Sequence, residues 1–167
     1  MDMTKQTDRQ TEPQVDRQTD RIEKKIFLRA PRSRVWRAIA DSQEFGQWFG
    51  VRLQGTFRTG AVLRGKVRYP GYEHVTLEVT VEEMQPERRI SWRWHPHALE
   101  TGRDYATEPT TLVVFELEDA PGGTTLTVVE SGFDGLPLDR RAAAFRGNDG
   151  GWTDQMRNIE RHIDASC

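Results

Sequence analysis

The end of the chain carries apolar residues at the spacing of an α-helix. One helical face between residues 148 and 164 holds large apolar side chains: Trp152, Met156, Ile159 and Ile163. The same phase continues backwards through Asp149, Phe145, Ala142 and Leu138. The pattern therefore predicts one long amphipathic helix, which needs an apolar surface to pack on.

Asp149 is the one polar residue of this stripe, and it lies among Gly147, Gly150 and Gly151. On a continuous helix Asp149 points inward, where a carboxylate needs a partner or solvent. Each glycine costs about 1 kcal/mol in a helix interior. The helix can therefore also break at 147–151, which would leave Asn148 or Asp149 as the N-cap of a shorter helix. Both interpretations are open.

Most of the preceding chain alternates apolar and polar residues at the period of β-strands. Strands are predicted over residues 21–30, 51–57, 61–69, 74–84, 88–95, 110–118 and 124–131. Two short helices follow the first strand. Pro31 can open the first of them, Asp41 or Ser42 can cap the second, and Gly50 can end it.

This order of elements predicts an α+β fold. Consecutive strands joined by short turns form an antiparallel meander, so we expect a curved antiparallel sheet wrapped around the long C-terminal helix. Residues 21–167 are predicted to form a single domain. Residues 1–20 are almost entirely polar, and a segment that buries so little apolar surface is expected to be a flexible tail.

Composition narrows the class of protein further. The chain has 24 basic and 26 acidic residues, which gives no electrostatic case for binding nucleic acid. Its single cysteine, Cys167, excludes an intramolecular disulfide and fits a reducing compartment. No apolar run is long enough for a membrane span, and no signal peptide is evident. We therefore expect a cytoplasmic protein.

Four stretches resemble a known family. They are Ala30-Pro31 to Trp36, Trp48-Phe49, residues 81–86 with Ile90 and Trp92, and the ending formed by residues 122–127, Ser131-Gly132 and Gly151-Trp152. In this order they resemble the START-like, or SRPBCC, helix-grip domains. Within that superfamily they are most similar to the group related to the C-terminal domain of Aha1, the activator of Hsp90 ATPase. The resemblance covers roughly residues 21–164.

The resemblance implies the helix-grip fold, with an apolar cavity between the sheet and the helix. It implies, as the leading function, binding of a small hydrophobic molecule of aromatic or lipid-like character. A cyclase- or aromatase-like enzyme acting in the same cavity is one alternative. An Hsp90 co-chaperone-like interaction module is another, although the chain shows no counterpart of the activator's separate N-terminal Hsp90-binding domain.

The aromatic residues are the main candidates for a ligand site. The predicted ligand-binding residues are Trp48, Phe49, Trp92, Trp94, Phe133, Asp149, Trp152 and Met156. Ligand pockets are largely apolar with a few polar anchors, and Asp149 is the proposed anchor. The alternative is that these side chains simply fill the core.

Other chemistry has little support in the sequence. No P-loop, Gly-x-Ser-x-Gly or paired catalytic carboxylates are present, so no catalytic residue, cofactor or metal is predicted, and a binding protein is favoured over an enzyme. His95-Pro96-His97 lacks further metal ligands at suitable spacing and is interpreted as a surface loop. The loop 96–109, with Tyr105, could be a lid or an interface. The oligomeric state is open.

Overall fold

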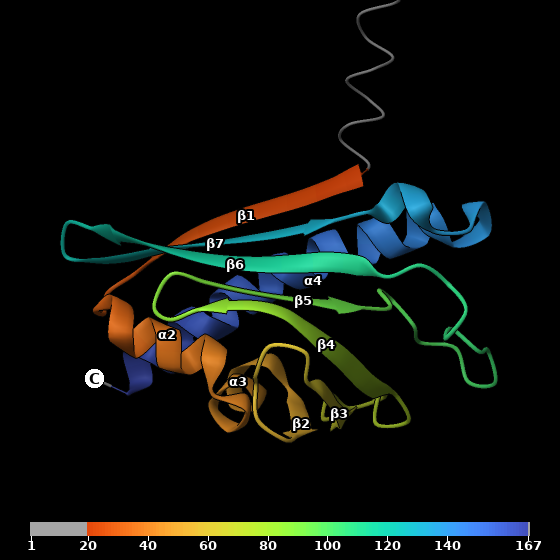
Figure 1. Cartoon of the computed structure of the whole chain (residues 1–167), viewed down its shortest axis with the longest axis horizontal. Helices are drawn as coiled ribbons and strands as arrows, with labels where there is room; N and C mark the ends of the chain where they lie inside the picture. The colour runs from red at the N-terminus through yellow and green to blue at the C-terminus, as the bar shows by residue number, and fades with distance from the viewer. Residues whose placement is uncertain (1–19, 167) are drawn as a thin grey trace, which may run out of the picture.

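Seven antiparallel strands form one sheet in the order β1-β7-β6-β5-β4-β3-β2 in a computed structural model that describes residues 20–166 (Figure 1). The strands are β1 (Arg21–Leu28), β2 (Val51–Gln54), β3 (Val62–Val67), β4 (Thr76–Gln85), β5 (Arg89–Trp94), β6 (Thr111–Ala120) and β7 (Gly123–Ser131). The sequence predicted all seven, within a few residues at their ends. The tail predicted over 1–20 lies, apart from Asp20, outside the described residues.

The helices also follow the predicted order. They are α2 (Arg32–Ala40), α3 (Ser42–Phe49), a short 3₁₀-helix η1 (Phe133–Gly135) and α4 (Leu138–Ala165). The Asp41 carboxylate accepts hydrogen bonds from the backbone N–H groups of Gln43 and Glu44, both at 3.0 Å, and so caps α3. Gly50 ends α3 in the left-handed conformation, with φ of 89°. The structure is therefore the predicted α+β helix-grip fold.

The sheet is curved, and the helices lie against two different parts of it. Helix α4 runs behind strands β5 to β7, while α2 and α3 lie at one end of the sheet (Figure 1). The register between β4 and β5 shifts between Val81 and Glu83, and such a bulge bends a strand and increases its twist. At Gly65 in β3, an added Cβ would lie 2.0 Å from the Arg52 carbonyl oxygen, so only glycine lets β2 approach this closely.

Helix α4 is unbroken, so the prediction of a continuous helix is confirmed and the N-cap alternative is wrong. Its buried residues are Arg140, Ala144, Trp152, Gln155, Met156, Ile159 and Ile163. In the first half of the predicted stripe only Phe145 packs against the core, since Leu138 is 81% exposed and Ala142 is exposed as well. Positions 140, 144, 148, 152 and 156 are four apart, and each such step drifts by about 40° around an α-helix. The buried face therefore winds around the helix, and position 148 replaces 149 as its inward member.

The prediction that Asp149 points inward is wrong for the same reason. Its carboxylate lies 2.9 Å from Nζ of Lys24 on strand β1, and the side chain is 50% exposed. The ion pair ties the outer side of α4 to the edge of the sheet. Such a half-exposed pair contributes little to stability.

The C-terminal turns of α4 are held by a second polar contact. His162 Nε2 lies 2.9 Å from the carboxylate of Glu44 in α3, which also pairs with Arg34. Burial by itself would raise the pKa of Glu44, but hydrogen bonds from His162 and Arg34 outweigh it and lower this pKa below its usual value. The contact joins α2, α3 and α4 at the end of the molecule opposite η1.

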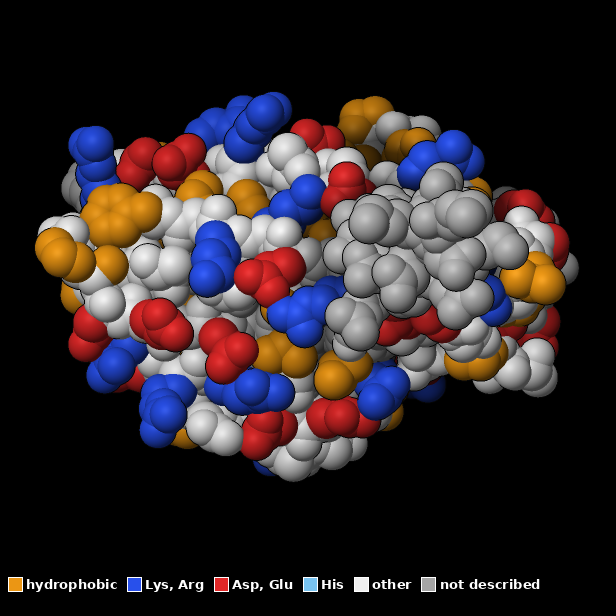
Figure 2. Space-filling model, turned by 90° about the horizontal axis from the view of Figure 1, so that it is seen from above, with side chains coloured by type: hydrophobic (Ala, Val, Ile, Leu, Met, Phe, Trp, Pro, Cys, Tyr) orange, Lys and Arg blue, Asp and Glu red, His pale blue; other side chains and the backbone are white. Residues whose placement is uncertain are grey.

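The outer surface seen along the β1 edge carries Lys and Arg side chains interspersed with Asp and Glu (Figure 2). Where the described residues are visible in this view, they form no broad single-sign patch, which agrees with the near balance of 24 basic and 26 acidic residues in the chain. Within residues 20–166, no helix is both long and apolar enough to cross a membrane.

Candidate functional site

An aromatic cluster fills the space between the sheet and α4. Its members come from α3, β5, β6 and α4, with neighbouring ring centroids 4.7–6.3 Å apart: Phe45, Phe49, Trp92, Trp94, Phe115 and Trp152. Most pairs are tilted or edge-to-face, the arrangements that aromatic rings prefer. The cluster is the apolar surface on which the C-terminal half of α4 packs.

A buried carboxylate lies at one side of this cluster. Glu130, near the end of β7, is 0% exposed. Its oxygens accept hydrogen bonds from Nε1 of Trp94 at 2.7 Å, Nε1 of Trp152 at 2.8 Å and Oγ1 of Thr111 at 2.5 Å. The Asn148 amide nitrogen lies 2.9 and 3.1 Å from its two oxygens. One side chain thus joins β5, β6, β7 and α4.

All the donors to Glu130 are neutral, and no ion pair of Glu130 is found within residues 20–166. A buried carboxylate is costly unless its oxygens are satisfied, and here five contacts satisfy them. The arrangement also serves Trp94 and Trp152, because a buried indole N–H needs an acceptor. Glu130 therefore fixes the rings of Trp94 and Trp152 as well as the amide of Asn148.

A cavity of about 560 Å³ opens on the other side of Trp94 and Asn148. Phe49 and Trp94 form one aromatic wall beside Asn148 of α4, and the rest comes from β3, β4, the loop between them and the loop between β5 and β6. Its apolar lining also includes Val67, Tyr69, Val75, Leu77, Ala98 and Leu99. The volume falls within the range of small-molecule pockets, about 300–1,000 Å³.

The loop between β5 and β6 is fastened to α4 by Arg140. This guanidinium is 7% exposed and donates to the carbonyl oxygens of Pro96 at 3.0 Å and His97 at 3.1 Å. It also pairs with Glu108 at 2.8 Å and stacks over the Tyr105 ring, 4.8 Å from its centroid. The loop therefore has a defined position as one wall of the cavity.

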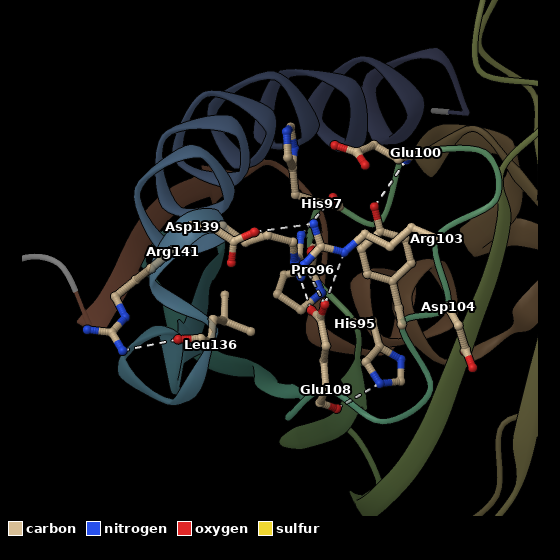
Figure 3. Close-up of polar contacts among 12 residues, drawn as sticks. His95, Pro96, His97, Glu100, Arg103, Asp104, Glu108, Leu136, Asp139 and Arg141 are labelled. Atoms are coloured by element: carbon tan, nitrogen blue, oxygen red, sulfur yellow. Dashed lines mark hydrogen bonds and ion pairs between the residues drawn. The ribbon is translucent and has the colours of Figure 1, made fainter.

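Arg103 strengthens the same attachment from within the loop. Its guanidinium lies 2.9 Å from Glu108 and 3.5 Å from Asp139 at the start of α4. In the close-up, Arg103 reaches the Glu108 carboxylate, and the His95 ring lies 3.1 Å from the backbone carbonyl oxygen of Glu108 (Figure 3). His95-Pro96-His97 lies in the loop between β5 and β6, as the sequence indicated, but Pro96 is buried and both histidines line the cavity.

His97 lies against α4 where Gly147 leaves room for it. An added Cβ at Gly147 would lie 2.6 Å from Nδ1 of His97. Burial, together with the nearby charge of Arg140, lowers the pKa of His97 below its usual value. No group of three or more His, Cys, Asp or Glu side chains that could hold a metal occurs in the described part of the chain.

The structure brings only some of the predicted site residues to this cavity. Phe49 and Trp94 line it, and Trp152 lies directly behind them, with ring centroids 5.9 Å from both. Met156 follows Trp152 on the buried face of α4. Asp149 does not line the cavity, so the enzyme alternative loses the carboxylate on which it depended.

The remaining predicted residues are core residues. Trp48 is 4% exposed and donates its indole N–H to the Ala38 carbonyl oxygen at 2.8 Å. Trp92 is fully buried between other rings. Phe133 packs edge-to-face on Phe145, with ring centroids 5.3 Å apart. For these residues the alternative interpretation, that they fill the core, describes their positions.

Sequence reasoning missed Glu130 and Asn148. Glu130 continues the inward-facing series of β7, after Thr124, Leu126 and Val128, which are all buried. A charged residue at an inward strand position is a signal of a buried polar site. Asn148 precedes Trp152 by one helical turn and was overlooked because the helix phase was assigned through Asp149.

Comparison with known proteins identifies the family. The family model for Activator of Hsp90 ATPase homolog 1-like protein matches residues 29–164. The chain belongs to this family. The resemblance noted from the sequence motifs is thereby confirmed. No curated protein matches the chain significantly.

Solved structures share the fold of this chain. DynU16, a protein of the dynemicin biosynthetic locus, is 25% identical with a TM-score of 0.68 over 88% of this chain, which spans only 48% of DynU16. MLL2253 from Mesorhizobium loti is 20% identical with a TM-score of 0.69, covering 88% of this chain and 98% of its own. The Aha1 dimer from Colwellia psychrerythraea is 14% identical with a TM-score of 0.64, covering 86% and 95%. The last two likenesses show the fold alone.

Proposed function

We propose that this family member binds a small, largely apolar molecule in the 560 Å³ cavity between the β5–β6 loop, strands β3 and β4, and α4. The observation that carries the proposal is the wall made by Phe49 and Trp94. Aromatic side chains at a cavity surface offer contact area for an apolar ligand. The rings are held in place before any ligand arrives, and this lowers the ordering cost of binding.

The position of the cavity differs from the one expected from the sequence. The deep space between the sheet and α4 is filled by the aromatic cluster, and the cavity lies at the end of that space, under the β5–β6 loop. The sequence allowed this loop to be either a lid or an interface. In this proposal the loop is the lid of the cavity. Arg140 and Arg103 hold it closed on one side.

One of the comparisons favours a small-molecule ligand. DynU16 is named for a biosynthetic locus, which fits a small organic ligand better than a chaperone partner. The 14% identity to the Aha1 dimer supports no transfer of partners from that protein. Apart from the description of the family, no observation on the described residues favours the Hsp90-binding alternative.

A blocking variant tests the proposal. Ala98 lines the cavity, so Ala98→Phe should fill part of it and weaken binding of the neutral hydrophobic dye Nile red at least about tenfold. Ala143 is exposed on α4 and does not line the cavity, so Ala143→Phe is the matched control and should bind the dye like the unchanged protein. Absence of dye binding to the unchanged protein, or equal binding by both variants, contradicts the proposal.

A further inference from the structure

Asn148 is shared between the buried carboxylate and the cavity. Its amide nitrogen lies 2.9 Å from Oε1 and 3.1 Å from Oε2 of Glu130, and the residue also lines the cavity wall beside Trp94. A carboxylate accepts hydrogen bonds and donates none when ionised. The Asn148 side chain is therefore turned with its nitrogen toward Glu130, because the opposite orientation would place two acceptors against each other.

With its nitrogen engaged by Glu130, the amide oxygen is the polar atom that Asn148 can offer to the cavity it lines. No hydrogen bond to Asn148 Oδ1 is found in the part of the chain that the structure describes. An acceptor at the wall of an apolar cavity favours a ligand that brings a hydroxyl or N–H donor to it. A ligand without a donor would cover this oxygen and leave it unsatisfied, which lowers affinity.

The charges around the cavity disfavour an anion. Glu130 lies directly behind Asn148 and has no cationic partner within residues 20–166. Arg103 at the cavity wall is already paired with Glu108 and Asp139. Glu78 at the wall pairs with Arg64, while Glu100 adds another carboxylate.

The histidines of the cavity wall add little positive charge. They are His74, His95 and His97, and the lowered pKa of His97 makes it a weak source of positive charge at neutral pH.

We propose that the cavity selects an uncharged, largely apolar molecule that donates one hydroxyl or N–H hydrogen bond to Asn148 Oδ1, and that it rejects carboxylates of the same shape. This inference rests on the proposed function, since it assigns the ligand class for that cavity. Glu130 acts in it as a positioning residue. It orients the Asn148 amide and supplies the negative charge behind the wall, without contacting the ligand.

Three naphthalene probes of one ring size test the inference by competition with Nile red: 2-naphthol, 2-methoxynaphthalene and 2-naphthoate. 2-Naphthol brings a hydroxyl donor, the methyl ether brings none, and 2-naphthoate is an anion. We expect 2-naphthol to bind about tenfold more tightly than the ether, the worth of one hydrogen bond. The carboxylate should bind at least about tenfold more weakly than 2-naphthol, because its charge faces that of Glu130.

Two variants separate the roles of Asn148 and Glu130. Asn148→Ala should bring the affinity for 2-naphthol down to that for the ether, and Asp154→Ala, at an exposed position of the same helix outside this cavity, is the control. Glu130→Gln keeps the shape but removes the charge, and it should weaken the rejection of 2-naphthoate relative to the ether. Should Glu130→Gln fail to fold, Asn148→Ala and the probe series still decide the outcome.

The possible failures are distinguishable. If Nile red binds but the three probes compete equally, or if none of them competes, the ligand class is wrong while the proposed function stands. The same holds if Asn148→Ala leaves the preference for 2-naphthol over the ether intact. If Nile red does not bind to the unchanged protein, the proposed function itself fails.

Discussion

Trp152 of helix α4 donates its indole N–H to Glu130 of strand β7, with Nε1 lying 2.8 Å from Oε1. Both residues are buried, with 2% and 0% of their surface exposed. The bond joins the sheet to the helix in the middle of an apolar interface, where an unpaired group on either side would be costly. Its partner bond from Trp94 reaches the other oxygen of the same carboxylate.

Glu130→Ala should destabilise the protein severely. It removes the acceptor for two indole N–H groups, the Thr111 hydroxyl and the Asn148 amide. We expect a loss of about 3–5 kcal/mol in the free energy of unfolding, measured by urea denaturation. Glu118→Ala, at an exposed position of β6, should stay within about 0.5 kcal/mol of the unchanged protein. Equal effects of the two substitutions would show that Glu130 is not a structural centre.

The glycines of α4 should not respond alike to alanine. An added Cβ at Gly150 or Gly151 meets no atom within 4 Å, so Gly150→Ala and Gly151→Ala should each stabilise the protein by about 0.5–1 kcal/mol. At Gly147 the new Cβ would lie 2.6 Å from Nδ1 of His97. Gly147→Ala should therefore lose that gain, because the histidine ring has to move. Thermal unfolding of the three variants compares them, and equal stabilisation would contradict the close contact at Gly147.

The fold was largely predictable because its signals are local. Strand alternation, the Asp41 cap and the Gly50 stop each depend on neighbouring residues, and all appear in the structure. The phase of the first half of α4 was not predictable in this way. Positions 148 and 149 are both close to the Trp152 face, and the choice between them is made by Glu130, 18 residues from Asn148 in the chain.

The cavity was harder to predict than the core for a related reason. Aromatic residues signal burial, but only long-range packing decides which of them fill space and which face a cavity. Trp92 and Trp94 lie two residues apart on one strand, yet Trp92 is fully buried and Trp94 lines the cavity. The wall opposite Trp94 comes from a polar loop whose position depends on Arg140, and no periodic pattern marks such a contact.

Arg140→Met should release the β5–β6 loop. The substitution keeps an apolar stem but removes the hydrogen bonds to the Pro96 and His97 carbonyl oxygens and leaves Glu108 with Arg103 alone. We expect amide hydrogen exchange across residues 95–110 to accelerate at least about tenfold, with little change in strands β1 and β7. Arg146→Met, at an exposed position of the same helix, is the matched control. Unchanged exchange in the loop would show that Arg140 does not hold it.

His97 should make stability fall between neutral and mildly acidic pH. Burial and the charge of Arg140 lower the pKa of His97 in the folded protein. In the unfolded chain this pKa is about 6.5. Below about pH 6.5 the unfolded state therefore binds more protons than the folded state, so the free energy of unfolding falls as pH drops toward the folded pKa. Above about pH 6.5, His97 no longer makes the free energy of unfolding depend on pH.

His97→Asn removes this titration and suits the backbone, because His97 has a φ of 53° and asparagine tolerates the left-handed region. Between pH 7 and pH 5.5, the variant should lose less stability in urea denaturation than the unchanged protein, and less than the matched variant His74→Asn. An NMR titration of the His97 ring protons measures the pKa directly. A midpoint at or above about 6.5 would contradict the prediction, because solvation of the ring would then exceed what its contact with Gly147 and α4 allows.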